Sequence, residues 1–102
     1  MGLTRNELFD ETTNYLGRLF CALGHPARLS ILFLLRDHDA MTVGEITNAL
    51  MLSQSTVSEH LSILKQRALI KSERIGTAMS YHLNQEIYPA FKDVLRNCAE
   101  EF

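Results

Sequence analysis

Short polar side chains crowd one stretch of this 102-residue sequence, LSQSTVSEHLSILKQRALI at residues 52–70. Hydroxyl and amide groups on short stems can donate and accept hydrogen bonds, which suits the base edges in the major groove of DNA. Lys65 and Arg67, near the end of the stretch, carry charges suited to phosphates. The alternative is an ordinary solvated helix face. The candidates for base contact are Gln54, Ser55, Thr56 and Ser58.

A helix that begins at Gln54 would place these candidates on one surface. Ser53 precedes it, and a serine hydroxyl can accept from the free backbone amides of a first helical turn. Val57, Leu61 and Leu64 then follow at i, i+4 and i+7, which gives the helix one apolar stripe to bury. Because the polar candidates lie away from that stripe, we expect them to face outward.

A shorter helix is expected immediately before this one. Thr42 and Glu45 have the T-x-x-E spacing of a capping box, in which each side chain bonds the other residue's backbone amide. The helix can run only to about Leu50 or Met51 before the next one starts. Two helices joined by so short a turn match the helix-turn-helix arrangement.

A two-stranded hairpin is expected next. Residues 69–75 have strand-like composition, residues 76–78 (Gly-Thr-Ala) form the turn, and apolar and polar residues alternate over 79–83. The turn carries no cation, so its tip offers little to the minor groove. Arg74 is the residue of this wing that we expect to contact a phosphate.

Three stretches together resemble the winged-helix repressors of the ArsR family: ALGHPARLSIL at 22–32, the two helices just described, and RIGTAMSYHL at 74–83. The resemblance covers nearly the whole chain. It implies a mainly α-helical fold with a small β-hairpin, about five helices plus a two-stranded wing. It also implies a bacterial homodimer that represses transcription from a double-stranded DNA operator until an inducer releases it. The inducer, a small molecule or a redox signal, is not identified.

The length fits one compact domain over residues 1–102. Residues 42–83 form the expected DNA-binding unit, and terminal helices over 4–23 and 85–102 are those that pair subunits in proteins of this kind. Thr4 and Glu7 make a capping box for the first, and both helices carry apolar stripes. Packing within one chain is the alternative use of these stripes. The expected interface residues are Leu16, Leu19, Phe20, Phe91, Leu95 and Cys98.

Two residues have ambiguous roles. His60 stands beside the apolar stripe of the second helix, where it either bonds a phosphate or completes the packing. Arg28 either forms a salt bridge or binds a phosphate. Just before it, Gly24 is expected to end one helix in the left-handed conformation, and Pro26 to lie in the first turn of the next.

The net charge of -2 argues against indiscriminate nucleic-acid binding. Its distribution leaves the DNA-binding unit locally positive, because many acidic residues lie near the termini. No stretch is long and apolar enough to cross a membrane, and no signal peptide is recognised, so we expect a cytoplasmic protein without membrane partners.

No metal and no cofactor are expected. In metal-sensing ArsR-like proteins a cysteine pair often stands where this sequence has Thr42 and Gly44, and another subgroup uses histidines on a last helix that has none here. Cys21 and His25 have an i, i+4 spacing, but Gly24 lies between them and metal sites need three or four ligands.

The two cysteines leave one alternative open. Cys98 lies within an apolar stripe, where a free thiol usually behaves as a small hydrophobic group. A thiol redox switch that joins Cys21 and Cys98 is the competing interpretation.

Two other classes of function fit the sequence less well. A winged helix can serve as a protein-protein interaction module, but the exposed polar row of the second helix is unlike the apolar and aromatic anchors of such surfaces. An enzyme is not expected, because the chain lacks a phosphate-binding glycine loop, a nucleophile elbow and a spaced carboxylate pair.

Overall fold

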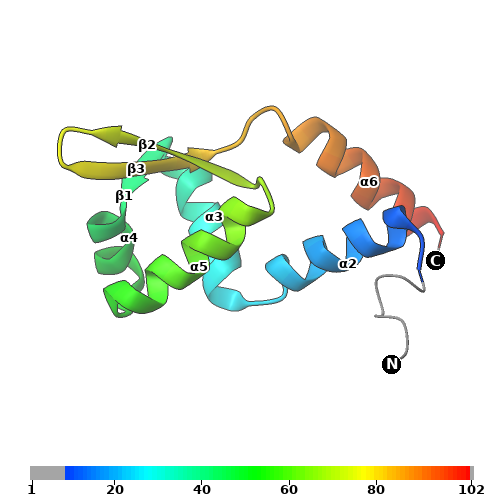
Figure 1. The fold of residues 1–102 in the computed structure, drawn as a ribbon, viewed down its shortest axis with the longest axis horizontal. Coiled ribbons are helices and arrows are strands. Elements are labelled where there is room, and N and C mark those ends of the chain that lie inside the picture. Colours follow the sequence, from blue (N-terminus) through cyan, green and yellow to red (C-terminus); the bar gives the residue numbers. More distant parts are fainter. Residues whose placement is uncertain (1–8, 102) are drawn as a thin grey trace, which may run out of the picture.

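The computed structural model describes residues 9–101 of the chain. Over that range it contains five helices and a three-stranded sheet, the mainly α-helical winged helix-turn-helix expected from the sequence (Figure 1). The elements are α2 (Glu11–Leu23), α3 (Pro26–His38), β1 (Ala40–Thr42), α4 (Val43–Leu50), α5 (Gln54–Gln66), β2 (Ile70–Ile75), β3 (Ala78–Leu83) and α6 (Tyr88–Glu100).

The hydrophobic core lies where α3, α4, α5 and the sheet meet. Ile31 and Leu35 of α3, Ile46 of α4, and Leu61 and Leu64 of α5 are all fully buried there. In Figure 1 the β2–β3 hairpin extends over α4 and α5, whereas α2 and α6 project together toward the opposite end of the molecule. The fold therefore separates an end that contains the helix-turn-helix and the hairpin from an end that contains α2 and α6.

Side-chain caps set the starts of both helices in the helix-turn-helix. The Thr42 hydroxyl accepts from the Glu45 amide at 3.2 Å, and the Glu45 carboxylate accepts from the Thr42 amide at 2.9 Å. The Ser53 hydroxyl accepts from the Thr56 amide at 3.2 Å. The capping box and the start of α5 at Gln54 are thus confirmed.

Of the helix expected over residues 4–23, the described range contains α2. Its first residue is Glu11, and the Asp10 carboxylate caps it by accepting from the Thr13 amide at 2.7 Å. This hydrogen bond lowers the pKa of Asp10. The capping box expected at Thr4 and Glu7 lies outside the described residues.

The junction between α2 and α3 differs from the expectation. Gly24 has a φ of -79°, so the predicted left-handed helix end is wrong. Arg28 from α3 instead donates to the last carbonyls of α2, at 2.6 Å to Ala22 and 3.0 Å to Cys21. A side chain thus satisfies carbonyls that a left-handed cap would otherwise bond. Pro26 does begin α3, as expected.

The wing is a hairpin with a two-residue turn. Strands β2 and β3 pair from Ile70 opposite Leu83 to Ile75 opposite Ala78, which leaves only the residues at 76 and 77 in the turn. Ala78 therefore belongs to the ladder rather than to the turn. Strand β1, which the sequence analysis did not predict, adds to the free edge of β3.

No single helix within residues 9–101 is long and apolar enough to span a membrane. Helices α2 and α3 pass such a test jointly, by length and composition only, and the chain bends by 85° between them.

Candidate nucleic-acid interface

Helix α5 presents the predicted polar row to solvent. Val57, Leu61 and Leu64 are buried against the core, and this orients the opposite side of the helix outward. The side chains of Gln54, Ser55 and Ser58 are exposed, whereas Thr56 is half-buried.

Hydroxyl groups at the start of α5 bond one another. The Ser53 hydroxyl lies 2.8 Å from the Thr56 hydroxyl and 3.2 Å from the Ser55 hydroxyl. Such bonds limit the rotation of these side chains before any ligand arrives. Gln54 and Ser58 have no such partner among the described residues, so their polar atoms are free to meet base edges.

The turn before α5 adds a residue that the sequence analysis did not single out as a contact. Met51 ends α4 in the left-handed conformation, with φ 58°, and its side chain is 89% exposed. Apolar side chains at the start of a recognition helix can contact the methyl group of thymine. No local sequence signal distinguishes this methionine from a core residue, because its exposure follows from the turn geometry.

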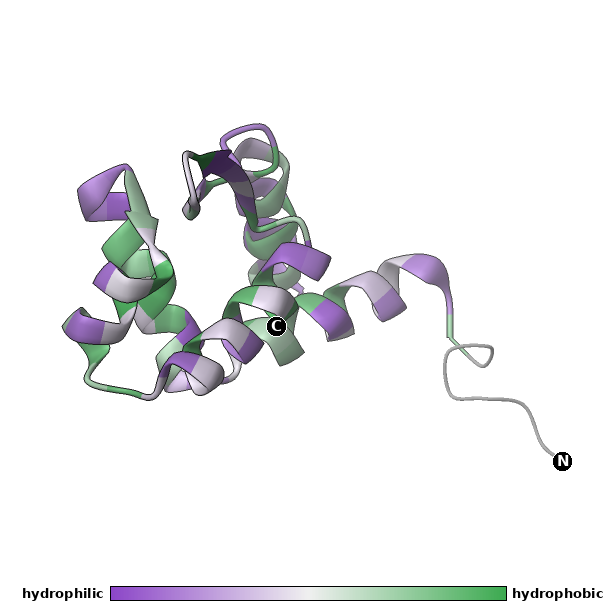
Figure 2. Cartoon of the chain, turned by 60° about the vertical axis from the view of Figure 1, so that its left-hand side comes forward, coloured by the Kyte–Doolittle hydropathy of each residue, from purple (hydrophilic) through white to green (hydrophobic). Residues whose placement is uncertain are grey.

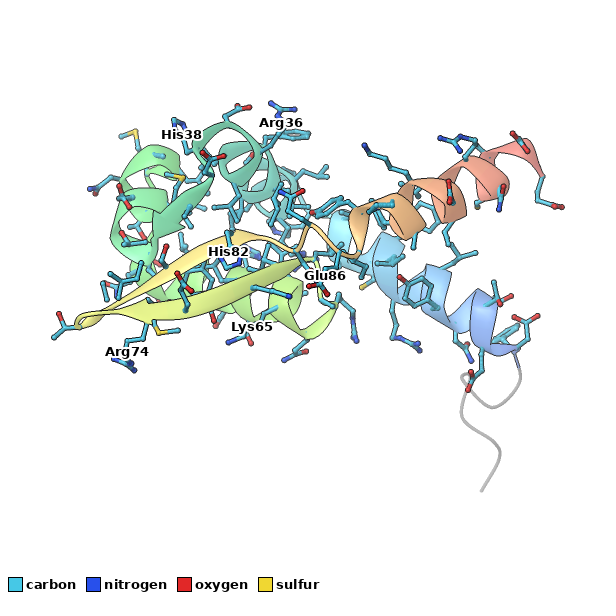
Figure 3. The ribbon with its side chains drawn as sticks, turned by 90° about the horizontal axis from the view of Figure 1, so that it is seen from above. Arg36, His38, Lys65, Arg74, His82 and Glu86 are labelled. Carbon is cyan, nitrogen blue, oxygen red and sulfur yellow. The ribbon has the colours of Figure 1, made fainter. Side chains whose placement is uncertain are left out.

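Two of the expected phosphate-binding cations lie near one another on the molecule. Figure 3 shows Lys65 of α5 and Arg74 of β2 projecting from the same side, away from Arg36 and His38. The Lys65 ammonium donates to the Ser72 hydroxyl at 2.7 Å, which ties α5 to the wing. Arg74 is exposed and has no ion pair among residues 9–101, whereas Lys71 pairs with Glu86 at 3.3 Å.

His60 is separated from the exposed row. It is only 9% exposed, and its Nδ1 lies 3.5 Å from a guanidinium nitrogen of Arg28. Its ring centroid is 4.4 Å from that of His25. Burial, followed by the charges of His25 and Arg28, lowers the pKa of His60. His60 is thus packed inside the protein, and Arg28 bonds backbone carbonyls instead of a carboxylate; phosphate contact by either residue stays a prediction.

The interface candidates on the terminal helices divide by burial. Leu19 and Phe91 are buried in the core of their own chain, so intrachain packing accounts for both. Leu16, Leu95 and Cys98 are half-buried, and Phe20 is 46% exposed. Hydrophobic and hydrophilic bands alternate along the helices that project toward the chain ends (Figure 2).

The positions considered for metal binding either make hydrogen bonds within the protein or lack enough neighbouring ligands. The Thr42 hydroxyl belongs to the capping box, and the Nδ1 atom of His25 accepts from the Ala27 amide at 3.1 Å. Over residues 9–101, no three histidine, cysteine or acidic side chains gather as a metal site would require. Cys21 and Cys98 are free thiols, the first exposed and the second half-buried.

The capped helix pair and the hairpin define a winged helix-turn-helix protein. A family model described as "Bacterial regulatory protein, arsR family" matches residues 25–72. The transcriptional repressor SdpR of Bacillus subtilis is 38% identical over 72 residues, which cover 71% of this chain and 79% of SdpR. An uncharacterised HTH-type transcriptional regulator of Methanocaldococcus jannaschii is 40% identical over 65 residues, or 64% of this chain and 73% of that protein. The chain belongs to the ArsR family of transcriptional regulators.

Solved structures of the family share the architecture. HlyU from Vibrio cholerae superposes with a TM-score of 0.71 at 28% identity, covering 88% of this chain and 97% of that one. A homodimeric winged helix-turn-helix DNA-binding domain from Mycobacterium bovis superposes with a TM-score of 0.72 at 26% identity, covering 99% and 91%.

Proposed function

We propose that this protein is a cytoplasmic, homodimeric transcriptional repressor that binds an inverted repeat in DNA. The observation that carries the proposal is the exposed polar row of Gln54, Ser55 and Ser58 at the start of the capped helix α5. Short donors and acceptors at that position suit base edges. A two-fold symmetric dimer presents two such helices and therefore selects a site with two-fold symmetry.

The distribution of charge favours selective binding. The net charge of -2 gives little general attraction to phosphates, whereas Lys65 and Arg74 project from one side of the molecule (Figure 3). Phosphate contacts from these two residues would position the protein, and base contacts from α5 would choose the sequence.

The terminal helices support the assembly. Phe20 leaves an aromatic side chain half in solvent on α2, beside the half-buried Leu16. Adjoining apolar side chains that stay exposed can form a contiguous patch, which is the kind of surface that associates. The related structure from Mycobacterium bovis is homodimeric, which supports the same assembly here.

Selection of bound duplexes from a random pool tests the proposal directly. We expect the selected duplexes to share one inverted repeat with half-sites about one helical turn apart, roughly 10 base pairs. If no duplex is preferred at moderate salt, the protein is not a sequence-specific repressor, and an interaction module becomes the better hypothesis.

Replacement of Gln54 or Ser58 by alanine should relax sequence preference. Loss of a good base contact costs about 1–3 kcal/mol for the selected duplex and much less for unrelated duplexes. The matched control is Arg74→Ala, which removes a proposed phosphate contact and should weaken binding to all duplexes alike. It should also reduce the slope of log affinity against log salt concentration by about 1. Kd values on selected and scrambled duplexes at several salt concentrations distinguish the two outcomes. Equal losses on both duplexes for Gln54→Ala and Ser58→Ala would remove these residues from base recognition.

Metal ions should leave the affinity for the selected duplex unchanged. Thr42 and Gly44 offer no thiolate, so zinc, cadmium and arsenite lack the soft ligands that they prefer. We also expect no response to peroxide, because a disulfide switch requires both thiols to be reachable and Cys98, unlike the exposed Cys21, is half-buried. Fluorescence anisotropy with labelled duplex measures both effects. Release by peroxide that disappears in a Cys21→Ser, Cys98→Ser double variant would instead establish a thiol switch.

A further inference from the structure

Arg28 connects three elements of the fold. Its guanidinium donates to the carbonyls of Ala22 and Cys21 at the end of α2, and it approaches Nδ1 of His60 in the middle of α5 at 3.5 Å. A guanidinium can only donate hydrogen bonds. Nδ1 of His60 must therefore act as the acceptor, which requires that this nitrogen carry no proton.

The neighbouring histidine has the same requirement. His25 caps the start of α3, where its Nδ1 accepts from the Ala27 amide at 3.1 Å. The His25 and His60 rings are 4.4 Å apart and tilted by 49°. Both imidazoles thus use an unprotonated Nδ1 to hold the junction together.

Protonation would work against this arrangement in two ways. A proton on Nδ1 turns each acceptor into a donor, which breaks the α3 cap and opposes the Arg28–His60 contact. The cluster would also hold additional positive charge beside a guanidinium. The charged and titratable groups that act on His60 are His25 and Arg28 from the start of α3 and Glu59 from α5, and only Glu59 favours the protonated form.

We propose that His25, Arg28 and His60 form a proton-sensitive latch that positions the recognition helix α5, so that mild acidification weakens binding to the operator. The operator part of this inference rests on the proposed DNA-binding function. All three are positioning residues, because His60 is buried and the other two reach it from the α2–α3 junction rather than from the exposed row.

The sign of the effect follows from linkage. The folded state lowers the pKa of His60, so the unfolded chain binds its proton first as the pH falls. The stability contributed by neutral His60 is present above the ordinary histidine pKa of about 6.5 and is lost as the pH falls below it. A protein that only gains positive charge on acidification should instead bind DNA more tightly. The latch therefore predicts a change in the opposite direction.

The test compares two double variants across the histidine titration range. His25→Asn keeps a capping side chain, and His60→Gln keeps an acceptor for Arg28, so this latch double variant does not titrate. The matched control is His38→Gln with His82→Gln, two histidines away from the latch. Affinity for the duplex selected from the random pool and the thermal unfolding midpoint are measured at about pH 7.5 and pH 5.5.

We expect wild type and the control variant to lose several-fold in affinity on acidification, because protonation of His60 removes the acceptor that Arg28 contacts. Their unfolding midpoints should fall as well, whereas the latch double variant should change by less than about twofold in affinity. Tighter binding by wild type at low pH, or equal loss in the latch double variant, would overturn the proposal.

Imidazole proton resonances of the wild-type protein keep the test independent of folding defects and of DNA. The His60 resonance should titrate below the ordinary histidine pKa of about 6.5. If no duplex is preferred by wild type, the proposed function fails, and the latch is then judged by these resonances and by the pH dependence of unfolding. A His60 resonance that titrates at or above the ordinary histidine pKa of about 6.5, together with an unfolding midpoint that does not change with pH, would exclude the latch.

Discussion

Replacement of Phe20 by glutamate should convert the proposed dimer to a monomer without unfolding the chain. The Phe20 side chain is 46% exposed in the isolated protomer, so a carboxylate there can stay hydrated when the chain folds alone. In a subunit interface the same carboxylate would be buried without a partner, at a cost of several kcal/mol. Sedimentation equilibrium should show the monomer mass, with an unchanged far-ultraviolet dichroism spectrum.

The same variant should lose operator affinity by about 100-fold or more, because linking two half-site contacts typically raises avidity by 10²–10⁴. Phe33→Glu is the matched control: this phenylalanine is 51% exposed on α3, outside the proposed interface. Leu95 is a poorer test site, because it is half-buried against the core of its own chain. A Phe20→Glu protein that remains dimeric would remove α2 from the interface.

Local signals predicted the helix-turn-helix well. The Thr42–Glu45 capping box and the Ser53 cap each act over three residues, so the sequence itself contains both partners of the interaction. The apolar stripe of α5 is equally local, and the buried residues Val57, Leu61 and Leu64 match it. Because the stripe orients the helix, the exposed face that holds the candidate base-contacting residues was predictable too.

Contacts between distant residues were not predictable in the same way. Arg28 and His60 are 32 positions apart, and no local sequence pattern around either residue identifies the other as its contact. Strand β1 has only three residues and exists because the edge of β3 is available to pair with it. The end of α2 was mispredicted for the same reason, since a side chain from the next helix satisfies its carbonyls.

For the terminal helices, the sequence did not predict which apolar residues pack within the chain and which stay exposed. Their apolar periodicity was visible, but a stripe does not state whether its residues pack within one chain or against a second copy. The structure assigns Leu19 and Phe91 to the protomer core and leaves Phe20 half in solvent. Burial in the folded chain, rather than hydrophobicity, separates these roles.

Replacement of Leu64 by alanine should cause a large loss of stability. Leu64 is fully buried where α5 packs on the core, and its carbonyl accepts from the Leu69 amide at 3.1 Å where the chain turns toward the wing. Deleting a buried leucine side chain leaves a cavity and costs about 2–5 kcal/mol. Domains of this size are stable by only about 5–15 kcal/mol, so the loss is a large fraction of the total.

Urea denaturation at one fixed protomer concentration measures this loss, because the stability of a dimer depends on concentration. The midpoint should fall for Leu64→Ala while the m-value stays unchanged, as expected when the native and unfolded states keep their compactness. Ser62→Ala is the matched control on the exposed face of the same helix and should change stability by no more than about 0.5 kcal/mol. A loss below about 1 kcal/mol for Leu64→Ala would mean that the packing beneath α5 is looser than the structure shows, and the exposed row would then lack the rigid support that base recognition requires.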